Sequence, residues 1–416
     1  MRMVLLSHVT GNANSRQALL TFYERNMLEA FYTTVAWNSQ SAWNELLPSS
    51  VSKELNRRAY PGIPMRLIHT APFREACRLL SMKLGIAALY EKHDSPFSIS
   101  RIYAHLDEWV AKAVSARPPT AVYAYASAAL ETFRAARKNG VKTIYELPTA
   151  YWHFFNQFLR EEAELQPDFA GTLHFNEPSM LRRQDEELDL ADRVIVPSVY
   201  VQSTLPAKIP GKMVHVIPYG APAVITGSPS RRSEENRKLR VLYVGALTQR
   251  KGLSYLLEAI HKVETEVEFT MIGSRSGTCK PLDAALQRYH WTPTAPHSAI
   301  LEAMSQNDVL AFPTLLEGFA LVVLEAMSRG MAVITTPSSG ALDVITNGKD
   351  GFIVPIRSSD ALAEKLDLLA NDRELLKSIS ESALRRAREC TWQSYRELLA
   401  STVNQVLQPA KESSHA

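Results

Sequence analysis

Short runs of β-branched and apolar residues alternate with stretches of helical periodicity along most of the chain, and this alternation constrains the fold more than any other feature. A strand that is followed by a crossover helix usually pairs in parallel with the next strand. The pattern therefore predicts βα units around parallel sheets. The expected strands are "MVLLSH", "AVYAYA", "KTIYEL", "RVIVPS" and "MVHVIPYG" in the first half, and "RVLYVGAL", "EFTMIG", "DVLAFPT", "MAVITT" and "GFIVPI" in the second. Stretches such as "SRQALLTFYERNMLEAFY" and "HLDEWVAKAVSA" are expected to be helices.

The chain divides at a stretch that is poor in large apolar residues. With 416 residues it is too long for one hydrophobic core. Residues 221–239, "APAVITGSPSRRSEENRKL", are rich in Ser, Pro and charge and are interpreted as a linker. This division predicts one domain over residues 1–220 and a second over residues 240–391. The end of the chain is expected to form two helices that are separated near Thr391.

Composition and charge exclude several classes of protein. With 46 basic and 43 acidic residues the net charge is only +3, so no broad attraction to nucleic acid is expected. The three cysteines form no CxxC pair and no metal-ligand spacing, and we expect reduced thiols in a cytoplasmic protein. No run of 18 apolar residues occurs, so no membrane-spanning helix is expected. Residues 53–92 mix cations with apolar residues at helical spacing, and this leaves open either a peripheral contact with the inner membrane face or an ordinary solvated helix.

Two carboxylates stand eight positions apart in the otherwise apolar stretch "PTLLEGFALVVLEAMSRGMAVITT", residues 313–336. We expect a strand end, a loop, a helix and a second strand here, and a helix N-terminus with its free amides and positive dipole can bind phosphate. The candidate phosphate donors are the backbone amides of Gly318, Phe319, Ala320 and Leu321. Glu317 and Glu325 cannot bind the same phosphate because like charges repel, so they would accept hydrogen bonds from hydroxyl groups on either side of it. A diphosphate between two hydroxyl-bearing rings, as in a nucleotide sugar, has this shape, whereas in the alternative interpretation the acids only complement the helix dipole.

A second candidate segment is "VLYVGALTQRKGLSYLLEAI", residues 241–260, which is interpreted as strand, loop and helix. Arg250 and Lys251 stand at the start of the helix, where a cation opposes the dipole at a cost of roughly 0.3–1 kcal/mol. A bound anion would reverse that sign, while a solvated basic loop is the alternative. Gly245 and Gly273 each end an expected strand and are candidate donor contacts, although a turn glycine explains Gly273 almost as well.

The stretch "EGFALVVLEA" resembles the Glu-x₇-Glu motif of retaining GT-B glycosyltransferases, in particular glycosyltransferase family 4, and the similarity continues through "GMAVITTPSSGALDVITNGKDGFIVP". The resemblance implies that Glu317 contacts the donor sugar, Glu325 the ribose and the intervening amides the phosphates. Lys251 matches the family's lysine that neutralises the donor diphosphate. The family's arginine after the preceding strand is absent, since Ala246 stands there, and Arg250 is a candidate substitute.

The resemblance is weak before about residue 140, where it implies an acceptor side. Family members carry a glycine-rich loop after the first strand, and here that loop is "VTGNANSR"; it is not G-x-G-x-x-G, which argues against a nicotinamide or flavin cofactor. The candidate acceptor and phosphate contacts in this loop are Gly11, Asn12, Asn14 and Arg16. Many relatives carry a histidine after the strand that matches "KTIYELPTA". This chain has Glu146 there, a candidate catalytic stand-in, and its next histidine, His153, is interpreted as structural.

The fold that the resemblance implies is GT-B: an α/β protein with two Rossmann-like domains facing each other across a cleft, and a C-terminal helix within residues 392–416 that crosses back to the first domain. The implied reaction moves a hexosyl group, with retention, from a nucleoside-diphosphate sugar to a hydroxyl of a glycan or lipid-linked acceptor. No cofactor and no metal are expected. Two alternatives stay open: a non-catalytic nucleotide-sugar-binding subunit of a polysaccharide assembly, and a GT-B-like sugar-nucleotide epimerase.

Overall fold

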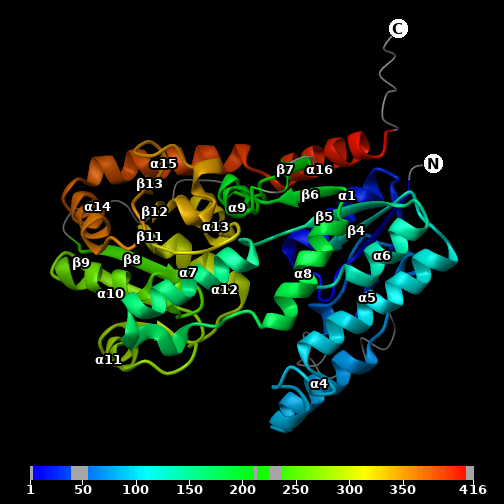
Figure 1. Ribbon diagram of the computed structural model, residues 1–416. Coiled ribbons are helices and arrows are strands. Elements are labelled where there is room, and N and C mark those ends of the chain that lie inside the picture. Colours follow the sequence, from blue (N-terminus) through cyan, green and yellow to red (C-terminus); the bar gives the residue numbers. More distant parts are fainter. Residues whose placement is uncertain (1–2, 39–54, 208, 210–212, 225–236, 409–416) are drawn as a thin grey trace.

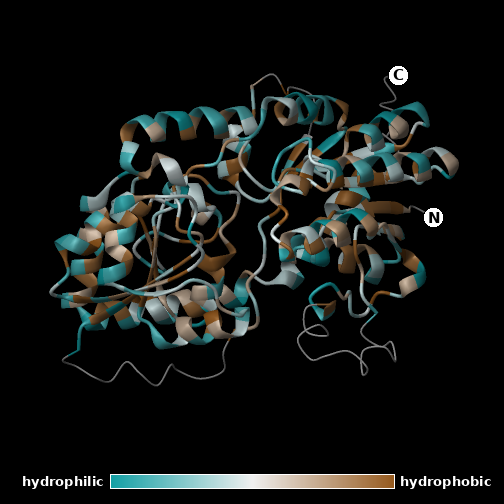
Figure 2. Ribbon diagram, turned by 90° about the horizontal axis from the view of Figure 1, so that it is seen from below, coloured by the Kyte–Doolittle hydropathy of each residue, from teal (hydrophilic) through white to brown (hydrophobic). Residues whose placement is uncertain are grey.

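Two parallel β-sheets lie side by side in the computed structural model, each covered by helices (Figure 1). The structure describes residues 3–38, 55–207, 209, 213–224 and 237–408. The strands are largely hydrophobic and the outer turns of the covering helices largely hydrophilic (Figure 2). The architecture is the two Rossmann-like units that the strand pattern predicts.

The first sheet has the strand order β3-β2-β1-β4-β5-β6-β7, with all neighbours parallel. Its strands are β1 (Val4–Ser7), β2 (Leu28–Thr33), β3 (Ile68–Thr70), β4 (Ala121–Tyr125), β5 (Lys142–Glu146), β6 (Arg193–Val196) and β7 (Met213–Val216). Successive side chains of a strand point to opposite faces. Leu6 of β1 therefore joins the core under α1, whereas Leu5 joins the core under α5 and α6.

The second sheet has the order β10-β9-β8-β11-β12-β13, again with parallel neighbours. Its strands are β8 (Leu239–Val244), β9 (Val267–Ile272), β10 (His290–Thr292), β11 (Val309–Phe312), β12 (Ala332–Thr335) and β13 (Phe352–Ile353). The ten strands expected from the sequence are all present. The short edge strands β3 and β10 have only three residues each, too few to show a pattern in the sequence.

Helices connect the strands and cover both sheets. The first half contains α1 (Ala13–Glu24), α4 (Phe73–Lys83), α5 (Ile99–Ala116), α6 (Leu130–Lys138), α7 (Trp152–Leu165), α8 (Pro178–Leu190) and α9 (Val199–Thr204). The second contains α10 (Leu253–Lys262), α11 (Lys280–Arg288), α12 (His297–Gln306), α13 (Leu321–Ser328), α14 (Ser359–Asn371), α15 (Arg373–Glu389) and α16 (Trp392–Val406). Short 3₁₀ turns are η1 (Met65–Leu67), η2 (Ala87–Leu89), η3 (Pro167–Thr172), η4 (Gln249–Lys251), η5 (Pro337–Ser339) and η6 (Ala341–Asp343).

One expected helix is wrong. The stretch "SRQALLTFYERNMLEAFY" is not a single helix, because α1 ends at Glu24 and residues Leu28–Thr33 form strand β2. Asn26 adopts a left-handed conformation with φ 53°, which stops the helix and turns the chain into the sheet. The apolar residues of β2 continue the helical spacing of α1 by coincidence, so periodicity alone did not reveal the boundary.

The last helix returns to the first domain. Helices α15 and α16 are separated at Cys390 and Thr391, and Thr391 caps α16 by accepting a hydrogen bond from the Ser394 amide (3.1 Å). Helix α16 packs against α1, where Arg396 donates to the side chain of Gln17 (2.7 Å). This is the expected crossing back. Most of the expected linker, residues 225–236, lies outside the described residues.

The carboxyl edges of the two sheets meet. Ser198, at the start of α9, donates from Oγ to the carbonyl of Gly318 in the second domain (2.7 Å). A Cβ on Gly318 would stand 1.7 Å from the carbonyl oxygen of Pro148, so a glycine is needed for this approach. The amide of Val199 donates to the carboxylate of Asp343, with distances of 3.1 and 3.3 Å to its two oxygens. The loops that follow the strands of both sheets therefore form one contact region.

The Asp343 contact makes stability depend on pH. Burial raises the pKa of Asp343 to about 6, and the hydrogen bond from Val199 only partly opposes this. The pKa in the folded protein lies above that of the unfolded chain. Protonated Asp343 therefore stabilises the folded protein fully below about pH 4, and this stabilisation is lost as the pH rises through about 6. Asp343→Asn keeps an acceptor for Val199 and cannot ionise. We expect the urea midpoint of the wild type, relative to Asp343→Asn, to fall between about pH 4.5 and pH 7.5; a constant or rising difference would contradict the assignment.

Candidate functional site

A cluster of charged side chains lies where the loop after β11 meets the start of α13. Lys251 Nζ is in direct contact with the Glu317 carboxylate, and Arg250 Nη1 lies 3.3 Å from the same carboxylate. Arg250 also donates to the carbonyl of Leu316 (2.8 Å). The structure thus brings together three candidates from separate parts of the sequence, with two cations sharing one carboxylate.

The two cations are held in place by the turn that carries them. Both belong to η4, which ends at Gly252 in a left-handed conformation with φ 73°. A Cβ on Gly252 would lie 2.0 Å from the carbonyl oxygen of Pro313, so only glycine lets η4 pack this closely on the strand β11 loop. The Lys-Gly pair is therefore explained by backbone packing as well as by charge.

Burial changes the electrostatics of the cations. Burial, followed by the neighbouring Arg250 guanidinium, lowers the pKa of Lys251 well below its usual range. Burial also lowers the pKa of Arg250. Desolvation disfavours the charged form of each group, and an anion in contact favours it. Glu317 supplies one negative charge for two cations, so the cluster can accept further negative charge.

The helix N-terminus is less open than expected. The amide of Ala320 donates to the carbonyl of Ser339 (2.9 Å), so it is engaged within the protein and the expectation that it binds phosphate is wrong for this structure. The missing side chain of Gly318 makes room for the Pro148 carbonyl, and the expected phosphate contact of the Gly318 amide stays a prediction. Phe319 is buried and packs edge-on against Tyr219 with 5.5 Å between the ring centroids, and Leu321 begins α13 half-buried.

Glu325 lies on α13, where it is paired with a histidine. His297 Nε2 and Glu325 Oε1 are 2.9 Å apart, and the side chain of Glu325 is 19% exposed. His297 is the first residue of α12 and is mostly exposed. Glu325 therefore remains accessible beside a second polar group.

The loop after β1 is organised by internal hydrogen bonds. The Gly11 amide donates to Nδ1 of His8 (2.8 Å), and Asn12 caps α1 by accepting from the Ser15 amide (3.0 Å). Arg16 donates to the carbonyls of Gly11 (2.7 Å), Arg57 (2.8 Å) and Ala59, and its guanidinium lies over the Tyr60 ring. Gly11, Asn12 and Arg16 thus hold the loop in shape, and the expectation that they contact phosphate or acceptor receives no support from their geometry.

Glu146 does not stand open for catalysis. It is only 1% exposed and accepts hydrogen bonds from Asn14 (2.9 Å), Tyr219 (2.8 Å) and Tyr123 (2.6 Å). Burial raises its pKa, and these hydrogen bonds oppose the rise. The structure corrects the expectation for both Glu146 and Asn14: they form a buried polar network that joins β5, α1 and the chain before the linker. His153, interpreted as structural, pairs with Asp185 of α8 (2.8 Å).

Gly245 and Gly273 touch each other at the ends of β8 and β9. A Cβ on Gly273 would lie 1.8 Å from the carbonyl oxygen of Gly245, and both residues have positive φ. Close backbone packing therefore accounts for both glycines. It also keeps the carboxyl ends of the two strands close to η4, where open α/β sheets bind their ligands.

Sequence reasoning missed the residues behind the cations. Gln249, the residue before Arg250, is fully buried and donates from Nε2 to Glu162 of α7 (2.7 Å). Glu162 lies 87 positions earlier in the chain, and a glutamate within a helix carries no signal of such a long-range contact.

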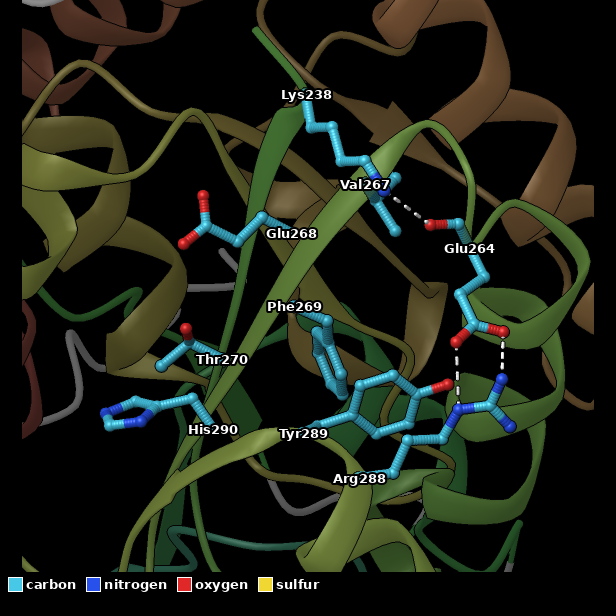
Figure 3. Close-up of a pocket in the computed structure, with 9 residues that line it drawn as sticks. All are labelled: Lys238, Glu264, Val267, Glu268, Phe269, Thr270, Arg288, Tyr289 and His290. Carbon is cyan, nitrogen blue, oxygen red and sulfur yellow. Dashed lines mark hydrogen bonds and ion pairs between the residues drawn. The ribbon is translucent and has the colours of Figure 1, made fainter.

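A pocket elsewhere in the second domain does not belong to this site. Figure 3 shows it beside the amino-terminal half of β9, lined by Val267, Glu268, Phe269 and Thr270, with Glu264 and Arg288 paired at its rim. Ligands of open α/β sheets bind at the carboxyl ends of the strands, and this pocket lies toward the opposite end. Within the residues that the structure describes, no three His, Cys, Asp or Glu side chains are grouped so as to hold a metal ion. No helix of that same part of the chain has the length and apolar character to cross a bilayer.

A known family of proteins resembles the second domain in sequence. Residues 228–386 match the sequence profile of the family described as glycosyl transferases group 1. The match covers the second domain and no part of the first sheet. The matched region includes both η4 and α13, so the charged cluster lies within it.

Curated relatives with similar sequences each match about a third of the chain. The capsular polysaccharide biosynthesis glycosyltransferase CapM of Staphylococcus aureus is 31% identical over 154 residues, which is 35% of this chain and 40% of that protein. An N,N'-diacetylbacillosaminyl-diphospho-undecaprenol alpha-1,3-N-acetylgalactosaminyltransferase of Campylobacter jejuni is 26% identical over 155 residues, which is 36% of this chain and 41% of that protein. The chain thus spans about two fifths of the length of these curated relatives.

Solved structures resemble the whole chain and establish the GT-B fold. A sucrose-phosphate synthase from Thermosynechococcus elongatus superimposes with a TM-score of 0.69 at 15% identity, covering 98% of this chain and 99% of the other. Anabaena HepE in complex with UDP superimposes with a TM-score of 0.62 at 17% identity, covering 97% and 100%. At this level of identity the similarity concerns the fold alone.

The cation cluster predicts a specific effect of Lys251. Lys251→Met keeps the apolar stem and removes the charge, so we expect binding of inorganic pyrophosphate to weaken at least about tenfold, since a hydrogen bond to a charged group contributes about 1.5–3 kcal/mol. The melting temperature should change little, because Glu317 keeps Arg250 as an ion-pair partner. Titration calorimetry and thermal unfolding measure the two effects. Lys262→Met, which removes an exposed lysine paired with Asp360, is the matched control. If Lys251→Met leaves pyrophosphate binding unchanged and lowers the melting temperature strongly, the role of Lys251 is structural.

Proposed function

We propose that this protein is a retaining glycosyltransferase that moves a hexosyl group from a nucleoside-diphosphate sugar to an acceptor hydroxyl in glycan, polysaccharide or glycolipid biosynthesis. The observation that carries the proposal is the meeting of Lys251, Arg250 and Glu317 at the start of α13. The cluster has one more cation than anion and lies at a helix N-terminus, so a diphosphate is the group that best balances its charge.

In the proposed reaction, the bond between the anomeric carbon and the donor diphosphate oxygen breaks, a bond to the acceptor oxygen forms, and the proton of the acceptor hydroxyl passes to the leaving diphosphate. Negative charge grows on the leaving diphosphate. Lys251 and Arg250 stabilise that charge from a partly dehydrated position, where electrostatic stabilisation is stronger than in water. Glu317 and Glu325 accept hydrogen bonds from donor hydroxyls, Glu317 from the sugar and Glu325 from the ribose. Glu317 must therefore share or release Lys251 when the donor binds.

The acceptor side supports one competing proposal. Glu146 and Asn14 are tied into a buried network, so the described structure offers neither as a group in contact with an acceptor. A subunit that binds nucleotide sugar without turning it over would need no such group. Acceptor-dependent release of nucleoside diphosphate separates the two proposals, and turnover of the donor without any acceptor would instead favour an epimerase.

The test begins with a thermal-shift screen of UDP-, GDP- and ADP-sugars and continues with assays of nucleoside diphosphate release in the presence of oligosaccharide or polyprenyl-diphosphate acceptors. Glu325→Ala should weaken binding of the selected donor by about 1–3 kcal/mol, because a donor hydroxyl loses its acceptor. Glu302→Ala, an exposed glutamate on the neighbouring helix α12, should leave binding unchanged. Wild-type affinity in Glu325→Ala would exclude the ribose contact, and the absence of a shift with every donor would exclude the proposed function.

We also propose a lipid-linked acceptor and a peripheral contact with an anionic membrane through α4. This helix projects from the first domain (Figure 1) and follows β3, at the carboxyl edge of the first sheet. Its apolar side is its exposed side: Phe73 (73% exposed), Leu80 (57%) and Leu84 (63%) lie at helical spacing. The side that faces the protein instead carries Glu75 and Ser81, both buried.

The surroundings of α4 favour a lipid surface over water. Large apolar side chains are also exposed nearby, namely Met65, Leu79, Met82, Ile86 and Ile99. Lys83 and Arg66 are exposed on this part of the protein, and Arg78 binds the buried Glu75 at 2.9 Å. The exposed carboxylates Glu91 and Glu177 also lie near Arg78 and Met82. An amphipathic helix with cations beside its apolar face binds at the surface of an anionic bilayer.

Vesicle sedimentation tests the α4 contact. We expect the protein to co-sediment with vesicles of phosphatidylglycerol and phosphatidylcholine, and the double variant Leu80→Glu, Leu84→Glu to lose at least about tenfold in partitioning, given roughly 1.5–3 kcal/mol per buried leucine. Leu398→Glu changes a leucine of similar exposure on α16 and should behave as the wild type. Light scattering completes the test by measuring the oligomeric state. If the wild type binds no vesicles and forms a dimer that is absent in the double variant, the surface binds a second copy of the chain and the proposal is contradicted.

A further inference from the structure

Helix α7 and the turn η3 belong to the first domain by sequence but to the second by packing. They lie in the chain between β5 and β6 of the first sheet. In Figure 1, α7 runs across the second domain near α10. Phe158 and Leu159 of α7 share an apolar cluster with Leu315 and Leu316, the two residues before Glu317. The segment therefore touches the loop that carries the proposed sugar contact.

Glu162 is the polar centre of this packing. Its side chain is fully buried and accepts hydrogen bonds from Gln249 Nε2 (2.7 Å), the Tyr255 hydroxyl (3.1 Å) and Arg357 Nε (2.7 Å). All three donors come from the second domain. A buried carboxylate with three donors is stable only while the donors remain, so α7 and the second domain are expected to move as one body.

The turn η3 adds further contacts on the same side of η4. The amide of Gln249 donates to Thr172 Oγ1 (2.9 Å), and Thr248 Oγ1 donates to the carbonyl of Thr172 (2.7 Å). A Cβ on Gly277 would lie 1.9 Å from the carbonyl oxygen of Gly171, so the two backbones are in direct contact. The residue immediately before Arg250 and Lys251 is thus held from behind by both η3 and α7.

Arg357 of the second domain binds two glutamates of α7. It adopts a left-handed backbone with φ 62°, which is unfavourable for a residue with a side chain. Its guanidinium binds Glu162 and Glu161 (2.6 Å) and lies over the ring of Phe158. A strained backbone persists where surrounding contacts determine it, and here those contacts are with α7.

From this geometry we infer that Glu162 is a positioning residue for the donor phosphates: through Gln249 it holds η4, and α7 with η3 is a fixed part of the donor-binding domain. The chain enters that domain after Pro148 and leaves it near His174. Any rotation between the domains must therefore bend the chain at these two points as well as at the linker and at Thr391. The inference rests on the proposed function only for the identity of the anion that η4 binds.

Two variants separate positioning from mere stability. Gln249→Leu breaks the link to η4 but leaves the pair of Glu162 and Arg357, so pyrophosphate affinity should fall about tenfold, the order expected for the loss of a buried hydrogen bond that orients a binding group. Glu162→Gln keeps an oxygen for Gln249 but removes the charge that Arg357 binds, so it should lower the melting temperature and preserve pyrophosphate affinity. Glu161→Gln removes the exposed partner of Arg357 and is the control for both. If both variants lose pyrophosphate affinity and thermal stability to the same extent, Glu162 does not position η4 through Gln249.

Two further measurements distinguish failure of this inference from failure of the proposed function. Hydrogen exchange of the η4 amides needs no donor: Gln249→Leu should accelerate it, and unchanged exchange would overturn the inference even in an active enzyme. His174 Nδ1 and Ser276 Oγ are 3.2 Å apart, so a short reducible cross-linker between the two cysteines of His174→Cys, Ser276→Cys would tie η3 to the second domain. The cross-linked protein should retain full turnover. Loss of turnover that a reductant restores would show that α7 and η3 move with the first domain.

Discussion

The contact between Lys251 and Glu317 is the interaction on which the proposed chemistry depends. A lysine this deeply buried is costly to keep charged, and burial lowers its pKa. Glu317 offsets part of that cost, but it also lies near Arg250, so one carboxylate serves two cations. The cluster stands at the first turn of α13, where the helix dipole adds positive potential. The site is therefore stable without a ligand yet has a charge imbalance that an incoming diphosphate corrects.

The same cluster is supported from both domains. The first domain reaches the α13 loop through Ser198 and Pro148, and it reaches η4 through Glu162 and Thr172. Tyr219 joins these regions, because it packs on Phe319 and hydrogen-bonds to the buried Glu146. Contacts of this kind explain why glycine is required at Gly318: any side chain would push the loop before α13 away from the first domain. The position of this loop therefore depends on backbone contacts between the domains as well as on charge.

The sequence predicts the parts of this structure that depend on local pattern. Uninterrupted apolar runs identify the central strands, since buried parallel strands are apolar on both faces. The strand, loop and helix around Glu317 and Glu325 are also present as predicted, and the donor contacts of these two residues stay predictions. Strand β2 was mistaken for helix, because its apolar spacing continues that of α1 and only the backbone of Asn26 marks the boundary. The sequence also does not reveal the internal hydrogen bonds in which four of the candidate residues take part, namely Gly11, Asn14, Arg16 and Glu146. The placement of α7 depends on partners such as Arg357, 195 positions from Glu162, which no local pattern reveals.

A crystal structure with a bound nucleoside diphosphate, chosen as the one that raises the melting temperature most, tests the central claim most directly. The account predicts phosphate oxygens within hydrogen-bonding distance of Lys251 Nζ and Arg250, with Glu317 turned toward the sugar side of the diphosphate. Phosphates bound elsewhere, with the contact between Lys251 and Glu317 unchanged, would contradict it.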